Sequence, residues 1–169
     1  IKFHHSMQNI LPFVWNGFRS SVKYTYLLKD IYKKETNLLE NLSSNTRKNI
    51  KKAEKTLEVF ESVDITKLYE LIELTFQRQS LKVPYSKEVL HNLFKTCQSK
   101  GLSKILMAKD STGNIHSGIL LIWNEKTVYY LVGGSDPRYR KSEAMTLIMW
   151  ESVKFASSFA QEFDFEGTM

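Results

Sequence analysis

Cysteine is almost absent from this chain, since Cys97 is the only one among 169 residues. A single thiol excludes an internal disulfide and is typical of a protein from a reducing compartment. No apolar run approaches the ~20 residues that a membrane-spanning helix needs. No secretory signal is recognisable either. We therefore expect a cytoplasmic protein without a transmembrane segment.

Motifs of several enzyme classes are also missing. The sequence has no Walker loop, no Gly-x-Gly-x-x-Gly and no nucleophile elbow around a serine or cysteine. The pair His4-His5 is followed by no Cys, His or carboxylate at ligand spacing, so we expect no bound metal. His91 and His116 stand in no motif. These absences argue against nucleotide hydrolysis by a P-loop, triad hydrolysis and metal chemistry.

Acidic residues are scarce in the amino-terminal third. Residues 1–56 hold 11 Lys and Arg against 4 Asp and Glu, whereas residues 57–169 hold 13 against 14. A helix predicted over 43–56 places its cations within an arc of roughly 140°; they are Arg47, Lys48, Lys51, Lys52 and Lys55. Two interpretations stay open. The stripe would bind a phosphate-rich partner such as RNA, a nucleotide or an anionic lipid head group, or it is a solvated helix face.

Hydrophobic residues make up 42% of the chain and aromatic residues 12%, which predicts one globular domain over 1–169. The chain starts at Ile1, so we expect a fragment, with 1–30 as a linker or strand from a preceding domain and a truncated C-terminal end. Strands are predicted at 22–28, 57–62, 102–109, 115–123, 127–132 and 162–166. Helices are predicted at 35–42, 43–56, 64–79, 86–101 and 142–159. The order predicts a mixed α/β (α+β) sheet layered with helices.

Core positions follow from the same periodicity. On the helix 86–101, one face is expected to point inward; it carries Val89, Leu90, Leu93, Phe94 and Cys97. Trp15, Trp123 and Trp150 are also expected in the core.

Residues 127–150, TVYYLVGGSDPRYRKSEAMTLIMW, carry the clearest functional signal. A strand here delivers its carboxyl end to the start of a long apolar helix, where unpaired N–H groups and the helix dipole favour an anion. Gly133 and Gly134 would let the backbone turn sharply and let a ligand approach it. Arg138, Arg140 and Lys141 add positive charge. The alternative is an ordinary β–α connection with solvated cations.

The last predicted strand reads Glu162-Phe163-Asp164-Phe165-Glu166. With a period of two, the phenylalanines face one way and the three acids the other. Because burying an unpaired charge is costly, we expect the acids to face solvent, a cleft or basic partners. If this strand lies beside 127–134, Asp164 or Glu166 would serve as a general base.

Several segments together resemble the GCN5-related N-acetyltransferase (GNAT) superfamily, and within it the bacterial Fem-type aminoacyltransferase and acetyltransferase-like branch. They are LPFVWNGF (11–18), YTYLL (24–28), NTRKNIKKAEK (45–55), TFQRQ (75–79), YYLVGGSDPRYRKSEA (129–144) and FDFEGTM (163–169). The resemblance implies two splayed strands that admit an acyl-CoA arm, with its pyrophosphate held by the turn before the long helix. By position, Gly133, Gly134 and Ser135 would end the splayed strand and Asp164 to Gly167 would face the acceptor. The pyrophosphate loop would run over Arg138, Tyr139, Arg140, Lys141, Ser142, Glu143 and Ala144, and it lacks the superfamily's central glycine.

The function that this resemblance implies is N-acyl transfer by direct attack of an amine within a ternary complex. The donor would be acyl-CoA, such as acetyl-CoA, or aminoacyl-tRNA as in Fem-type relatives. The acceptor would be a small-molecule, peptide or glycan amine. Asp164 or Glu166 would take the amine proton, and Tyr130 or Tyr139 would give one to the leaving group. The alternative is a catalytically silent GNAT-like module that binds RNA or another polyanion through the helix 43–56. Fem-type relatives usually pair two such domains, so a second GNAT-like domain is a further expected partner.

Overall fold

The computed structural model describes residue 7, residues 9–21 and residues 24–166. Its centre is a six-stranded sheet in the order β1-β6-β5-β4-β3-β2. The strands are β1 (Leu27–Lys29), β2 (Leu57–Ser62), β3 (Ser103–Asp110), β4 (Ile115–Trp123), β5 (Thr127–Ser135) and β6 (Glu162–Asp164). All neighbours pair antiparallel except β5 and β6, which run parallel. The predicted mixed, mostly antiparallel sheet is confirmed.

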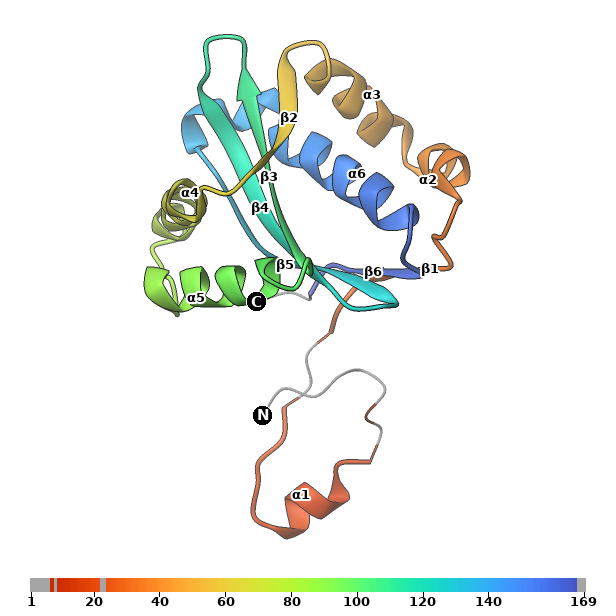
Figure 1. The fold of residues 1–169 in the computed structure, drawn as a ribbon, viewed down its shortest axis with the longest axis vertical. Helices are drawn as coiled ribbons and strands as arrows, with labels where there is room; N and C mark the ends of the chain where they lie inside the picture. The colour runs from red at the N-terminus through yellow and green to blue at the C-terminus, as the bar shows by residue number, and fades with distance from the viewer. Residues whose placement is uncertain (1–6, 8, 22–23, 167–169) are drawn as a thin grey trace.

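Helices cover both faces of this sheet (Figure 1). On one face lie α2 (Glu35–Asn41), α3 (Ser44–Ala53) and the long α6 (Ala144–Ser157), and on the other lie α4 (Ile65–Arg78) and α5 (Lys87–Gln98). A short helix, α1 (Leu11–Trp15), precedes the sheet, and a 3-10 helix, η1 (Pro137–Ser142), joins β5 to α6. Within the described residues, no helix is long and apolar enough to cross a membrane.

Side-chain caps define where three of the helices begin. Ser43, Asp64 and Ser86 each accept a hydrogen bond from the N–H three residues later, at the starts of α3, α4 and α5. Such a bond satisfies one of the N–H groups that a helix start leaves unpaired. These three starts lie where the sequence predicts them.

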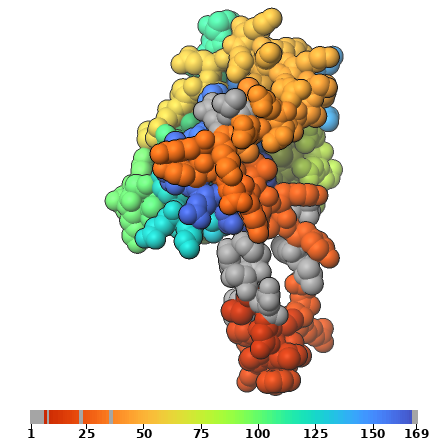
Figure 2. Space-filling model, turned by 90° about the vertical axis from the view of Figure 1, so that its right-hand side faces the viewer, coloured from red at the N-terminus to blue at the C-terminus, as the bar shows by residue number. Residues whose placement is uncertain are grey.

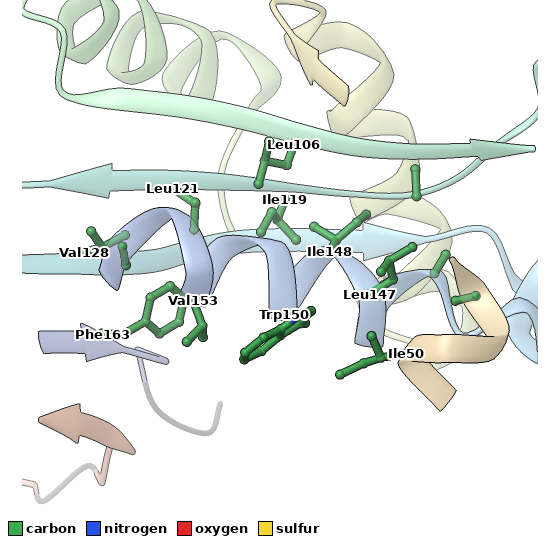
Figure 3. Packing of buried hydrophobic residues seen from close by; sticks show 14 of the residues in the cluster. Ile50, Leu106, Ile119, Leu121, Val128, Leu147, Ile148, Trp150, Val153 and Phe163 are labelled. Carbon is green, nitrogen blue, oxygen red and sulfur yellow. The ribbon is translucent and has the colours of Figure 1, made fainter. Parts of the chain in front are cut away.

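The core lies mainly between α6 and the sheet (Figure 3). Ile148, Ile119 and Leu121 are fully buried there, together with Phe163 from β6. Ile50 and Ala53 join them from α3, as its apolar side predicts. This packing fixes the start of α6 against the ends of β4 and β5, because a close-packed interior leaves its elements little freedom to shift.

The pairing of β5 with β6 is short. It joins Thr127, Val128 and Tyr129 to Glu162, Phe163 and Asp164, and β5 then continues for six more residues to Ser135. Among the described residues, none pairs with β5 on that side beyond Tyr129. The two strands therefore part at Tyr129 and leave a free edge, as the resemblance implies.

Several sequence predictions about single residues are wrong. Val89 and Leu93 are 58% and 39% exposed, because α5 packs against the sheet and α4 on a narrower face that buries Leu90 and Phe94. Trp15 is 77% exposed, since α1 buries none of its residues and lies apart from the sheet (Figure 2). Trp150 is buried as expected.

Element boundaries also differ from the prediction, and two of the differences bear on the site. The strand predicted at 22–28 is the shorter β1, and residues 22 and 23 lie outside the described residues. The strand predicted to end at 132 extends to Ser135, so no sharp turn occurs at Gly133 or Gly134. The chain turns later, through η1 and Glu143.

Candidate functional site

A pocket of about 270 Å³ lies where β5 runs free of β6. Its walls come from the last turns of α4, the start of β4, the end of β5, η1 and the first turn of α6. The lining residues are Thr75, Arg78, Ser117, Tyr130, Gly133, Gly134, Ser135, Tyr139, Arg140, Ser142, Glu143, Ala144, Met145 and Thr146. The strand–helix connection singled out in the sequence thus does form one wall of a pocket.

The start of α6 supplies hydrogen-bond donors to this pocket. Glu143 precedes the helix in the left-handed conformation, with φ at 61°, and its side chain accepts no N–H of the first turn. Among the described residues, the N–H groups of Met145 and Thr146 have no acceptor, whereas Ala144 N–H has only a long contact of 3.4 Å to Ser142 Oγ. Unpaired donors at the positive end of a helix dipole favour an anion.

Hydroxyl groups line the pocket beside these donors. Ser117 Oγ and Ser135 Oγ are 2.8 Å apart, so one of them donates to the other and the second proton can point elsewhere. Thr75 Oγ1 accepts the N–H of Ser135 at 2.9 Å and donates to the Leu71 carbonyl at 3.0 Å. This bond ties the end of β5 to α4.

The charge at the pocket is positive. Arg78 and Arg140 line it, against one carboxylate, Glu143, whose Oε2 accepts the Thr146 hydroxyl at 3.1 Å. Lys52 extends the positive charge outward, because its Nζ donates to the Lys141 carbonyl at 3.3 Å and so joins α3 to the loop. This arrangement suits a ligand that carries more than one negative charge.

Arg138 lies in the loop but does not line the pocket. Its guanidinium donates to both oxygens of Asp136 at 2.6–3.1 Å, and Asp136 is buried. Hydrogen bonds from Arg138 hold the pKa of the Asp136 carboxyl below its usual value. The pair therefore fixes the loop, and its charge is internally balanced.

Tyr130 lines the pocket next to Gly133. Burial raises the pKa of its phenol, so the hydroxyl stays protonated at neutral pH and can donate a hydrogen bond. A Cβ built on Gly133 would come within 2.7 Å of this hydroxyl. Gly133 therefore makes room for Tyr130 on the sheet.

Gly134 has a structural role in place of the predicted one, which was to let a ligand approach the backbone. A Cβ at this position would come within 2.2 Å of the Leu71 carbonyl carbon and 2.3 Å of the Ile72 nitrogen. The missing side chain lets the backbone of α4 lie directly on β5. The close approach expected for a ligand is here an approach by a helix.

The acids of the last strand lie at the point where β5 and β6 part, since Asp164 is the last residue paired with β5. Asp164 is 5% exposed, so it does not face solvent, which was one of the three surroundings expected for these acids. Its carboxylate accepts the Thr25 hydroxyl and, at 2.8 Å, the Glu166 N–H, which compensate for lost hydration. Neither Asp164 nor Glu166 lines the pocket, and Gly167 lies outside the described residues.

The cations predicted on the helix 43–56 divide into two groups. Arg47 donates to the carbonyls of Glu40 and Leu42 and so links α2 to α3. The other four are exposed: Lys48, Lys51, Lys52 and Lys55. Of the five predicted cations, Arg47 therefore has a structural role, whereas the four lysines are exposed to solvent.

Sequence reasoning missed much of the pocket, including Thr75, Arg78, Ser117, Met145 and Thr146. For Met145 and Thr146 a signal exists: the residue directly before α6 is a glutamate, which is a poor N-cap. No local pattern marks Thr75 and Arg78, which reach the pocket only because α4 crosses β5.

A family model of the acetyltransferase (GNAT) domain matches residues 42–167. The chain belongs to this family. Membership confirms the predicted resemblance and the expectation of an acyltransferase domain. Among curated protein sequences, none matches the chain.

Solved structures agree with the GNAT fold. FemX superposes with a TM-score of 0.75 at 17% identity, over 87% of this chain and 54% of FemX. A conserved protein of unknown function from Bacteroides thetaiotaomicron follows at 0.56 and 12%, over 88% and 51% of the two chains. The C-terminal domain of a putative lysylphosphatidylglycerol synthetase from Agrobacterium fabrum reaches 0.53 and 12%, over 86% and 46%. This chain thus spans about half the length of these three relatives in fold.

Proposed function

We propose that this GNAT domain is an N-acyltransferase that binds the phosphates of its acyl donor in the pocket at the start of α6. The observation that carries the proposal is the pair of unpaired N–H groups on Met145 and Thr146, set at the free edge of β5. A diphosphate would accept both donors and lie beside Arg140. Family membership supports the same placement.

The donor that fits this pocket is acyl-CoA, such as acetyl-CoA. Its pyrophosphate would accept hydrogen bonds from the amides at the start of α6 and from the Ser142 hydroxyl. The pantetheine arm of the CoA would follow the edge of β5 that β6 leaves free. The exposed lysines of α3 join this loop through Lys52, so the 3′ end of an aminoacyl-tRNA is the second donor with suitable charge.

The strand β5 also offers a place for the acyl carbonyl. Leu131 has no partner on β4, because Leu120 pairs with Val132 and Leu121 with Tyr130. Such a bulge turns backbone N–H groups out of the regular ladder. One of them would polarise the carbonyl and stabilise the oxyanion that forms when the amine attacks.

Proton transfers would complete the reaction. The amine nitrogen forms a bond to the carbonyl carbon, and the bond to sulfur, or to oxygen in an ester, breaks. Asp164 or Glu166, through water, would take the proton from the amine. Tyr130, which lines the pocket and carries a protonated hydroxyl, would give a proton to the leaving group. The acceptor is then a small-molecule, peptide or glycan amine, and a second GNAT-like domain would complete its binding surface.

The acid–base assignment is tested by the double variant Asp164→Asn/Glu166→Gln. General base catalysis contributes about 10²–10⁴-fold, so we expect kcat to fall by at least about 100-fold while acetyl-CoA binding persists. Thiol release from acetyl-CoA with a panel of amines measures kcat. Glu125→Gln, an exposed acid in the β4–β5 hairpin, is the matched control. Unchanged turnover in the double variant would remove both residues from the mechanism.

A second candidate function rests on four exposed lysines, of which Lys48, Lys51 and Lys52 lie on α3 and Lys55 lies in the turn after it. The domain would be a catalytically silent module that binds RNA or another polyanion through this face. Binding to a single-stranded RNA probe would then weaken steeply with salt, and Lys48→Glu/Lys51→Glu/Lys52→Glu would abolish it. If acetyl-CoA binds and RNA does not, the first function holds and this one fails.

A further inference from the structure

His116, which stands in no sequence motif, is a buried histidine at the edge of the pocket. It lies on β4 next to the lining residue Ser117 and is 6% exposed. Its imidazole stacks on the ring of Tyr139, with 4.0 Å between the ring centroids and 3° between their planes. Tyr139 itself lines the pocket. A buried side chain of β4 is thus in face-to-face contact with the loop expected to hold phosphate.

Asp110 holds the other edge of the imidazole. Its Oδ2 lies 3.1 Å from His116 Nε2, and its Oδ1 accepts the N–H groups of Thr112 and Asn114 at 2.9 and 3.0 Å. Hydrogen bonds from Thr112 and Asn114 hold the pKa of the Asp110 carboxyl well below its usual value. An ionised carboxylate only accepts, so in this hydrogen bond His116 Nε2–H donates to Asp110 Oδ2.

The remaining nitrogen makes no hydrogen bond. His116 Nδ1 is buried and has no partner within the described part of the chain. It therefore does not hold the loop through a polar contact. What the imidazole offers to Tyr139 is its flat face.

The backbone reinforces the same junction. Asp136 N–H donates to the His116 carbonyl at 2.9 Å, and Tyr139 N–H donates to the Asp136 carbonyl at 3.1 Å. The loop thus leaves the end of β5 beside His116 of β4 and returns to lie on the His116 ring. Arg140 and Ser142, the next lining residues, follow directly from this fixed point.

We propose that His116 is a positioning residue for the donor site: its ring face fixes Tyr139, and Tyr139 sets the place of Arg140 and of the donors behind it. The inference rests on the proposed function, because it assigns His116 to the affinity for the phosphorylated donor. His116 touches neither donor nor acceptor and takes no part in proton transfer.

Two matched substitutions separate the contribution of the ring face from those of the hydrogen bond to Asp110 and of the buried volume. His116→Leu and His116→Phe both lose the hydrogen bond to Asp110 and both fill the buried space, but only phenylalanine keeps a flat ring. We expect His116→Leu to raise the Kd and the KM for acetyl-CoA by roughly three- to tenfold, the effect typical of one aromatic pair, with kcat unchanged. His116→Phe should bind acetyl-CoA like the wild type. His91→Ala, on the exposed side of α5, is the control for loss of a histidine.

Calorimetric titration with acetyl-CoA and steady-state kinetics read out the result, and a double-mutant cycle with Tyr139→Leu assigns it. If His116 acts through Tyr139, His116→Leu adds nothing in the Tyr139→Leu background. Wild-type affinity in His116→Leu, an equal loss in His116→Phe, or additive effects in the cycle would each overturn the inference while the proposed function stands. No binding of acetyl-CoA by the wild-type chain would overturn the proposed function and this inference with it.

Discussion

Reversing the charge of Arg140 should reduce kcat/KM for acetyl-CoA on the order of 100-fold. Arg140 is exposed at the pocket, and among the described residues no carboxylate pairs with it. A hydrogen bond to a charged group contributes about 1.5–3 kcal/mol, and Arg140→Glu would replace that bond with repulsion. The loss should appear mainly in KM, because the phosphates are held equally in the ground state and the transition state.

Lys100→Glu is the matched control for this prediction. It makes the same change of charge at an exposed residue that follows the end of α5. Its kcat/KM should remain within about twofold of the wild type, because separated surface charges are largely screened at physiological ionic strength. Equal losses in the two variants would mean that only net charge matters. No loss in Arg140→Glu would place the phosphates elsewhere.

Replacing Gly134 by alanine should destabilise the fold by about 3 kcal/mol or more, at the upper end of what overpacking costs. The new Cβ would lie 2.2 Å from the Leu71 carbonyl carbon and 2.3 Å from the Leu71 oxygen. These are backbone atoms inside α4, so they cannot rotate away as a side chain would. Relief requires α4 to move off β5, which would also carry Thr75 and Arg78 away from the pocket. Urea unfolding followed by circular dichroism measures the loss.

Gly118→Ala provides the comparison for Gly134→Ala. Its Cβ would meet only side-chain atoms, the nearest being Leu68 Cδ1 and Met107 Cγ at 3.2 Å. These atoms can shift by a few tenths of an ångström, so we expect a loss of about 1 kcal/mol. A Gly134→Ala protein as stable as Gly118→Ala would show that α4 does not lie on β5 as described.

Local patterns predicted the kind and order of most elements. Strands predicted in succession at 102–109, 115–123 and 127–132 correspond to β3, β4 and β5, and helices predicted to begin at 43, 64 and 86 begin at the caps Ser43, Asp64 and Ser86. Family resemblance added the parting of β5 from β6. These features depend on residues that are neighbours in sequence, or on a pattern shared by many chains.

Features that depend on distant residues escaped prediction. The purpose of Gly134 is set by α4, about 60 positions earlier in the chain. The burial of Asp164 depends on Thr25, 139 positions away. The stack of His116 on Tyr139 joins a strand to a loop whose path is set by Asp136. Because Glu143 adopts the left-handed conformation, α6 begins at Ala144, two residues later than predicted. The amides of Met145 and Thr146 therefore lie in its first turn, without an acceptor among the described residues.

The binding of donor phosphates by these two amides can be observed directly in ¹H–¹⁵N spectra of the chain titrated with acetyl-CoA. We expect the amide protons of Met145 and Thr146 to move downfield more than any others and to saturate along the same binding curve, because each gains a charged acceptor. The Arg140→Glu protein should reach the same shifts only at much higher acetyl-CoA concentrations. Saturation of the protein with acetyl-CoA while both amides stay at their initial positions would contradict the assignment of this pocket as the donor site.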